Sequence, residues 1–191
     1  HFIELTEAEQ NLVLHGYHIR AYRVQHNVPC YGYCIEIPRS GRFDAAAASA
    51  LGLPVQTWNR LQKGETILWE DKEYAPDMVM GPPRKGIKVA YCTDTRPIDR
   101  IADNAKGADL FICEGMYAEP DKLAKAKQYK HMTFYEAAEL ATKAEVKQMW
   151  LTHFSPSLVG AKGYMKDVKR IFAESYLGED GKMLELDFLE E

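Results

Sequence analysis

Five side chains able to bind a metal ion or transfer a proton occur where strands or helices are predicted to end: His26, Asp94, Glu114, His131 and His153. Imidazole and carboxylate groups bind zinc and other divalent ions, and they are common general acids and bases. Taken singly, an Asp flanked by Thr is more often a helix N-cap, and a loop His is more often a surface residue. The recurrence of these residue types at element ends favours a functional site.

Three of these side chains follow predicted buried strands: Asp94 follows 87–92, Glu114 follows 109–113, and His153 follows 146–151. Strands alternate with helices from residue 87 onward, which is typical of an α/β sheet. The carboxyl ends of neighbouring strands meet at one edge of such a sheet, so we expect the three side chains to converge. His131 precedes a predicted helix and should join them.

The remaining pattern predicts further strands at 2–5, 17–25, 31–37, 67–69, 73–74 and 184–188, and helices at 45–48, up to 62, 98–105, 120–130, 133–143 and 162–176. Thr133 and Glu136 have the spacing of a capping box, which marks a helix start. The segment 81–86, rich in Gly and Pro, is predicted to be a linker.

Composition bounds the class of protein. The 191 residues are 46% hydrophobic and 27% charged, which is enough for one globular domain with a real core. The chain has no apolar run long enough to span a membrane, and its four cysteines form no C-x-x-C pair, so we expect a reduced, cytoplasmic protein. The net charge of -4 argues against a general nucleic-acid coat but allows a local basic patch.

One such patch is predicted in a segment at about residues 39–76. Arg39, Arg42, Arg60 and Lys63 face a single acid, Asp44, across residues 39–63. Two readings stay open: the segment is an ordinary surface subdomain, or it is a projecting basic arm that contacts a phosphate backbone.

Several motifs together resemble ribonuclease Z, the tRNA 3′ endonuclease of the metallo-β-lactamase superfamily. The matching stretches are His-Asn-Val-Pro-Cys-Tyr-Gly-Tyr from His26, Thr-Asp-Thr-Arg-Pro around Asp94, and Leu-Thr-His-Phe-Ser-Pro around His153. Cys-Glu-Gly-Met at 113–116 resembles the family's His-Glu-Ala-Thr motif, and His-Met-Thr at 131–133 resembles its His-Ser-Thr motif. The resemblance covers nearly the whole chain, including the segment at 39–76.

The resemblance implies a fold, a cofactor and a set of roles. The fold would be the α/β metallo-β-lactamase αββα sandwich with an inserted arm. His26, Asp94 and His153 would hold zinc, two ions per complete site, with Asp94 bridging them. Glu114 and His131 would deliver a proton to the departing 3′-oxygen. The partner would be precursor tRNA, contacted by Arg39, Arg42, Arg60 and Lys63, and the complete enzyme would be a homodimer without a membrane partner.

The sequence also departs from the family pattern. The His-x-His-x-Asp-His motif, which supplies most of the other zinc ligands, is absent; His15 and His18 have the wrong spacing for it. The chain begins with His1 rather than Met, so we expect residues 1–191 to be the C-terminal half of the fold, inactive in isolation. Cys113 stands where the family has His, Leu-Pro-Val-Gln at 53–56 replaces the arm's Gly-Pro pattern, and Ser-Leu at 157–158 replaces an Arg-Tyr pair.

Two other functions fit the same residues. The chain could belong to another phosphodiesterase or hydrolase of the superfamily, although such relatives usually lack a basic projecting insert. It could instead be a non-catalytic fragment that associates with itself, because a chain cut within a sheet exposes strand edges and apolar surface.

Overall fold

The computed structural model describes residues 2–189, which form two compact units. Residues 38–86 make up the smaller unit, and the other described residues make up the larger one. The candidate zinc and proton-transfer residues all belong to the larger unit, whereas the four basic residues expected to contact tRNA belong to the smaller unit.

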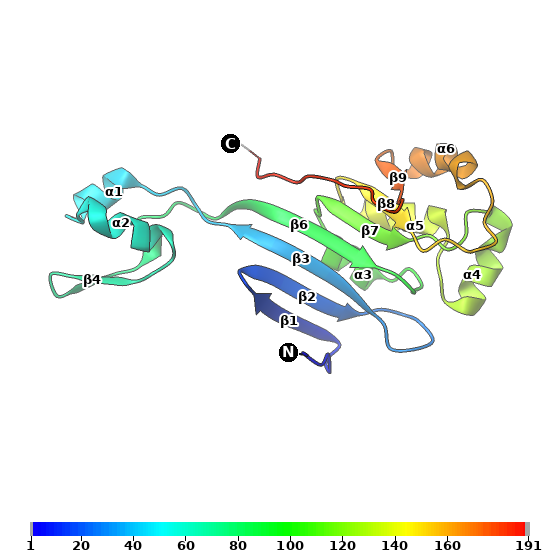
Figure 1. The fold of residues 1–191 in the computed structure, drawn as a ribbon, viewed down its shortest axis with the longest axis horizontal. Helices are drawn as coiled ribbons and strands as arrows, with labels where there is room; N and C mark the ends of the chain where they lie inside the picture. Colours follow the sequence, from blue (N-terminus) through cyan, green and yellow to red (C-terminus); the bar gives the residue numbers. More distant parts are fainter. Residues whose placement is uncertain (1, 190–191) are drawn as a thin grey trace. The chain divides into compact units, whose positions relative to one another are not determined.

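The larger unit is built on a seven-stranded sheet with the order β1-β2-β3-β6-β7-β8-β9 (Figure 1). Strands β1 to β3 pair antiparallel, and β6 to β9 pair parallel, each with the next. The strands are β1 (Glu9–Leu14), β2 (Tyr17–Arg23), β3 (Tyr31–Arg39), β6 (Arg84–Cys92), β7 (Leu110–Glu114), β8 (Met149–Thr152) and β9 (Ser175–Leu177). The parallel half has the continuous apolar strands of a sheet whose connections are helical.

Helices cover one face of this sheet. They are α3 (Asp99–Ala105), α4 (Leu123–Tyr129) after a 3₁₀ turn η2 (Pro120–Lys122), α5 (Phe134–Lys143) and α6 (Ala161–Ile171). Figure 1 shows α3 and α5 behind the sheet, and the core between them includes Phe111, Phe134 and Leu151, all fully buried. None of the helices within residues 2–189 combines the length and the apolar character needed to cross a membrane.

The start of α5 shows how local sequence sets the site. Thr133 accepts a hydrogen bond from the backbone N–H of Glu136 at 3.2 Å, and Glu136 Oε2 accepts one from the backbone N–H of Thr133 at 2.9 Å. This is the predicted capping box, which satisfies amide groups that the first helical turn leaves without partners. It fixes where helix α5 begins, at Phe134, three residues after His131.

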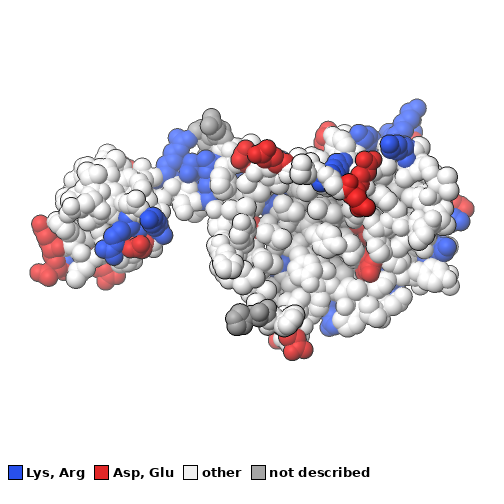
Figure 2. All heavy atoms as spheres, viewed as in Figure 1, with Lys and Arg blue, Asp and Glu red and all other residues white. Residues whose placement is uncertain are grey.

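The opposite face of the sheet is more open. Cys34 and Cys92 belong to the core beneath the helices, so their strand neighbours Ile35 and Tyr91 point away from it. Ile35 is 40% exposed and Tyr91 is 41% exposed. Figure 2 shows that this side of the larger unit carries few charged side chains.

The smaller unit has a core of its own. The unit contains α1 (Ala45–Ala50), α2 (Val55–Gln62), the hairpin β4 (Ile67–Trp69) and β5 (Lys72–Tyr74), and a 3₁₀ turn η1 (Pro76–Met78). Asp44 caps α1 by accepting a hydrogen bond from the Ala47 N–H at 2.8 Å. The core residues are Ala48, Leu53, Leu61, Ile67, Tyr74 and Val79. Whether this unit is the tRNA-binding arm expected at about 39–76 stays a prediction.

The surface of the smaller unit is less basic than residues 39–63 alone suggest. Residues 38–86 hold seven Lys and Arg and six Asp and Glu, so the acids of residues 65–77 nearly balance the basic segment. Figure 2 shows both colours on this unit, with red atoms at the end where Figure 1 places the β4–β5 hairpin. Glu70 and Asp71 form the turn of that hairpin.

The structure corrects four predicted elements. Residues 2–5 form no strand; the first strand is β1, which pairs with β2 across a turn at His15 and Gly16. The helix predicted at 162–176 ends at Ile171, because the chain extends at Phe172 to enter the missed strand β9. Residues 184–188 form no strand but line a shallow pocket with Asp109, Lys147 and Gln148. The predicted linker 81–86 is shorter, since β6 begins at Arg84.

Candidate metal and proton-transfer site

The parallel strands bring three of the predicted site residues to one edge of the sheet. Strand β7 lies between β6 and β8, with Cys92 opposite Cys113 and Glu114 opposite Thr152. Asp94, Glu114 and His153 therefore follow or end three adjacent strands at the same edge. The convergence expected from the strand order is what the structure shows.

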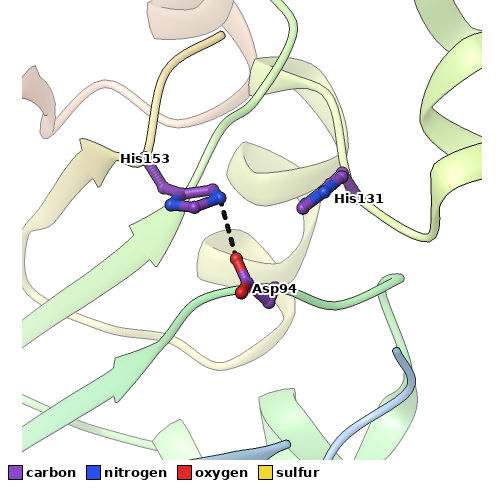
Figure 3. Close-up of side chains that lie close together, drawn as sticks. All are labelled: Asp94, His131 and His153. Carbon is purple, nitrogen blue, oxygen red and sulfur yellow. Dashed lines mark ion pairs between the residues drawn. The ribbon is translucent and has the colours of Figure 1, made fainter. Parts of the chain in front are cut away.

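A tight cluster forms at this edge from Asp94, His131 and His153. One possible ligand atom from each residue lies within 4.8 Å of the others. Figure 3 shows the three side chains reaching from separate loops toward a common centre. Two imidazoles and one carboxylate are a donor set that zinc accepts.

The contact between Asp94 and His153 has the character expected of two ligands that face one ion. His153 Nε2 lies 2.8 Å from Asp94 Oδ1. Asp94 Oδ1 is nevertheless a buried atom without a hydrogen-bond partner among residues 2–189, so the two atoms are close but not aligned as donor and acceptor. A buried carboxylate oxygen in that state carries a large desolvation cost that a cation would offset. The residues present thus fit a divalent metal ion.

The backbone is strained at the same places. Asp94 has a φ of 40° and His153 a φ of 57°, and Lys130, directly before His131, has a φ of 58°. A residue other than Gly in this left-handed region costs on the order of 1 kcal/mol and persists only where its surroundings hold it. Two hydrogen bonds from backbone N–H groups hold the chain here. The Thr95 N–H donates to the Glu114 carboxylate, and the Gly115 N–H donates to the Thr152 carbonyl.

Glu114 is a fully buried carboxylate that joins three parts of the site. Its Oε1 accepts hydrogen bonds from the Thr95 N–H at 2.6 Å and from His131 Nδ1 at 3.2 Å, and its Oε2 accepts one from the Met132 N–H at 3.0 Å. Burial raises the pKa of Glu114 to about 7, while the two backbone donors act in the opposite direction. With its pKa at about 7, the Glu114 carboxyl can exchange a proton with the His131 imidazole.

His131 is oriented by Glu114 and presents its other ring nitrogen to the cluster. Because Glu114 accepts from Nδ1, Nε2 is free to act toward Asp94 and His153. Burial lowers the pKa of His131, and the nearby His26 lowers it further, whereas Asp94 raises it. The metal-free imidazole therefore favours the neutral form, and an approaching anion would favour the protonated one.

His26 lies beside this cluster rather than within it. Its ring centroid is 5.0 Å from that of His131, and its Nδ1 donates to the backbone carbonyl of Lys130 at 3.0 Å. A metal-binding His commonly donates its second nitrogen to a carbonyl in this way, which leaves Nε2 for the ion. The geometry is compatible with the predicted ligand role of His26, which stays a prediction.

The four basic residues predicted to contact tRNA have individual surroundings. Arg60 Nε contacts Glu65 Oε2 at 2.8 Å, so part of its charge is already paired. Lys63 lines an open pocket of about 690 Å³ together with Pro76, Met80 and Pro82. The substrate-binding role of Arg39, Arg42, Arg60 and Lys63 remains a prediction.

Sequence reasoning missed two residues that connect the site, Thr95 and Arg96. Thr95 is fully buried, and its hydroxyl accepts from the Gln25 N–H at 3.0 Å. Arg96 donates to the backbone carbonyl of His131 and to the Glu136 carboxylate. Both lie in the motif Thr-Asp-Thr-Arg-Pro, but Gln25, His131 and Glu136 are 35 to 70 positions away from them in the sequence, so local spacing gave no signal for these contacts.

Comparison with known proteins was made at the level of family, sequence and fold. Residues 77–154 match the model of the beta-lactamase superfamily domain. Ribonuclease Z of Agathobacter rectalis is 59% identical over 189 residues, which cover 99% of this chain and 62% of that protein. Ribonuclease Z of Lachnospira eligens is 56% identical over 190 residues, with 62% of that protein covered. The chain thus spans about 62% of the length of these curated relatives.

Solved structures support the same fold. A metallo-beta-lactamase fold protein from Bacillus subtilis superposes with a TM-score of 0.60 at 19% identity, covering 94% of this chain and 54% of that one. Human tRNase Z, short form, superposes with a TM-score of 0.56 at 18% identity, covering 95% of this chain and 48% of that one. The fold is that of the metallo-β-lactamase α/β sandwich, as the sequence predicted.

Proposed function

We propose that the chain forms part of a zinc-dependent endonuclease that trims the 3′ end of precursor tRNA, because residues 77–154 match the beta-lactamase superfamily domain and the chain is 59% identical to a ribonuclease Z. The observation that carries the proposal is the convergence of Asp94, His131 and His153 in a chain that is 59% identical to a ribonuclease Z. The reaction would be hydrolysis of one phosphodiester bond.

In this proposal His26, Asp94 and His153 would hold zinc, and Asp94 would reach both ions of a complete site. Zinc, when bound, would supply Lewis-acid chemistry toward the phosphate and a stronger nucleophile from water. The unpartnered Asp94 Oδ1, 2.8 Å from His153 Nε2, supports this assignment.

His131 would act as the general acid for the departing 3′-oxygen. The hydrogen bond from its Nδ1 to Glu114 fixes the tautomer and leaves Nε2 facing the cluster, where a proton donor to the substrate is needed. The anionic phosphodiester would raise the pKa of the imidazole on binding, and the Glu114 carboxylate would stabilise the imidazolium that results. Glu114 itself would touch no substrate atom and would act through His131.

The remaining zinc ligands are proposed to come from a His-x-His-x-Asp-His motif that residues 1–191 do not contain. The chain alone should then bind zinc weakly and substoichiometrically, because three ligand candidates cannot complete two coordination shells. It should also have negligible nuclease activity.

A reconstitution experiment tests this function. The chain is mixed with a separately expressed segment that carries a His-x-His-x-Asp-His motif, and zinc content, precursor tRNA binding and cleavage are measured together. We expect all three to rise in step as the pieces associate, since metal binding is coupled to assembly of the site. The same mixture without zinc is the matched control.

Three results would oppose the proposal in different ways. Robust trimming, or two tightly bound zinc ions, in the chain alone would overturn the incomplete-site assignment, with His15 and His18 the first additional ligands to test. Hydrolysis of a small phosphodiester without cleavage of precursor tRNA would favour another superfamily phosphodiesterase. Association without metal binding or catalysis would favour a non-catalytic fragment.

A homodimeric complete enzyme and a cytoplasmic location also belong to the proposal. Light scattering of the reconstituted protein tests the first, and cell fractionation tests the second.

A further inference from the structure

We propose that Arg96 is a positioning residue that holds the His131 imidazole in register with Glu114 and Asp94; the inference rests on the proposed role of His131 as proton donor. Arg96 lies two positions beyond Asp94, and its side chain is only 14% exposed. Its Nη1 donates to the backbone carbonyl of His131. No other described side chain of the site makes a hydrogen bond to that carbonyl in residues 2–189.

The guanidinium is itself anchored by a second residue, Glu136. Nη1 donates to Glu136 Oε2 at 3.1 Å, and Nη2 donates to Glu136 Oε1. Glu136 is held in turn by the capping box, through Oε2 and the Thr133 N–H at 2.9 Å. The guanidinium of Arg96 thus connects the fixed start of α5 to His131, the proposed proton donor.

The backbone of Arg96 extends the same link to His26. The Arg96 N–H donates to the Gln25 carbonyl at 2.9 Å, directly before His26. One residue therefore connects the three loops that carry His26, Asp94 and His131. Loops are the mobile parts of a fold, so a link between them has a direct effect on the distances within the site.

His131 needs such a link because its own turn is strained. Lys130 adopts the left-handed conformation, and the imidazole is restrained by the contact of Nδ1 with Glu114 at 3.2 Å and by the neighbouring rings of His26 and His153. Loss of the Arg96 contact would free the His131 carbonyl, although the His131 and Met132 N–H groups keep their hydrogen bonds to Ala126 and Glu114, and would let Nε2 shift. A misplacement of about 1 Å in a reacting group can cost on the order of 10²-fold in rate.

Two substitutions isolate this action. Arg96→Lys keeps the positive charge but loses the planar fork, so it cannot contact His131 and Glu136 together. Glu136→Gln keeps an acceptor for the capping box but removes the ion pair. Arg100→Lys is the matched control, because Arg100 is an exposed arginine on nearby α3 whose contacts are with Glu9 and Arg23.

The activity test uses the reconstituted, zinc-loaded enzyme with two small phosphodiesters, one with a p-nitrophenolate leaving group and one with an alkoxide leaving group. Only the alkoxide needs a proton from His131. We expect Arg96→Lys to slow the alkoxide substrate about 10- to 100-fold, the usual range for groups that orient a functional residue. The p-nitrophenolate substrate, the zinc content and the Arg100→Lys variant should change little.

A double-mutant cycle then tests whether Arg96 acts through His131. In a His131→Ala background, Arg96→Lys should cause no further loss on the alkoxide substrate, since the group that it positions is gone. Equal slowing of both substrates, or an additional loss in that background, would overturn the proposal and make Arg96 a general stabiliser of the fold.

A readout without catalysis keeps the two proposals separate. In ¹⁵N-histidine NMR of the metal-free chain, the His131 Nδ1 signal should lose its hydrogen-bonded character in Arg96→Lys and keep it in Arg100→Lys. An unchanged Nδ1 signal in Arg96→Lys would contradict the positioning role. If the reconstituted wild type cleaves no phosphodiester, the proposed function fails, and this NMR comparison alone decides the role of Arg96.

Discussion

The edge of the sheet beyond β6, β7 and β8 and the unit of residues 38–86 place their polar side chains in different ways. At the sheet edge, Glu114 is fully buried and its carboxylate is held by two backbone N–H groups. In the smaller unit, Arg60 and Lys63 project from the surface of a small core, and Arg60 has an exposed acid as its partner.

The difference separates two physical requirements. Proton transfer and metal binding demand positions fixed to a fraction of an ångström, and buried backbone hydrogen bonds together with strained φ angles provide them. Contact with a phosphate backbone demands charge within reach, and long exposed side chains provide that without a rigid setting. Substitutions at the sheet edge should therefore act through geometry and those in the smaller unit through charge.

The largest effect is expected at Asp94. Asp94→Asn keeps a residue type that tolerates the observed φ of 40° but removes the charge proposed to reach both metal ions. Cleavage by the reconstituted enzyme should fall to background and zinc content should drop, while association of the two pieces remains. Mass spectrometry of bound metal beside a cleavage assay would check this. Retained zinc with full cleavage would remove Asp94 from the site.

A smaller loss is expected at His131. His131→Ala should slow cleavage by roughly 10²- to 10⁴-fold, the usual range for a lost general acid, with zinc content unchanged. The zinc measurement is decisive because His131 also lies within the cluster of possible ligands. If zinc disappears together with activity, His131 is a ligand and the proton donor must be sought elsewhere.

Titration of Glu114 should make the free energy of unfolding depend on pH. Burial raises its pKa to about 7 from an ordinary value of 4.5, so between these pH values the folded chain holds a proton that the unfolded chain has released. Stability of the metal-free chain should thus fall as pH rises through this window and level off above it. The total change should be at most about 3 kcal/mol.

Glu114→Gln should flatten this pH dependence, because an amide does not titrate. It should also destabilise the chain by about 1–3 kcal/mol at the lower pH, since the amide cannot accept from both Thr95 and Met132 without placing its NH₂ against a donor. Chemical denaturation from pH 4.5 to 8 measures both effects, with the exposed Glu139→Gln as control. A Glu114→Gln profile with the same pH dependence as the wild type would contradict the titration of Glu114 in this window.

The smallest effect is expected from the smaller unit. Neutralising Arg39, Arg42, Arg60 and Lys63 together should raise the KM for precursor tRNA about tenfold, since each exposed charge contributes on the order of 0.2–1 kcal/mol. It should also flatten the salt dependence of tRNA binding. Arg60 should contribute less than Lys63 alone, because Glu65 already pairs with it.

A small phosphodiester supplies the control for that experiment, since it lacks the tRNA backbone that the four basic residues are proposed to contact. Its hydrolysis should be spared. Neutralising the acidic hairpin residues Glu70, Asp71 and Glu73 should shift tRNA affinity in the opposite direction. Equal loss on both substrates would mean that the four basic side chains support the fold instead of binding substrate.

The sequence could predict those features of these regions that depend on residues close together in the chain or on the order of the elements. The parallel strands could be recognised because each is a short apolar run, and the α5 start because its capping box spans four residues. Asp94, Glu114 and His153 followed from strand order alone. Each of these signals is local or depends on the order of the elements.

What the sequence could not predict depends on contacts between distant segments. The link from Arg96 to His131 and Glu136 crosses 35 and 40 positions, and nothing in the local pattern marks it. Strand β9 was hidden in a helical pattern, since only pairing of Ser175 with Met149 distinguishes it. The strained φ angles at Asp94 and His153 were likewise invisible, because residue type permits such angles without requiring them.

The open face of the sheet predicts that the stability of this chain depends on what covers that face, including a second copy of the chain. Ile35 and Tyr91, which point away from the helices, are about two-fifths exposed, and Tyr17 at the end of the neighbouring strand β2 is 45% exposed. Any association that covers these side chains favours the folded form by mass action. An unfolding midpoint measured on the isolated chain is then a property of the solution, and it should rise as the protein is concentrated and fall on dilution.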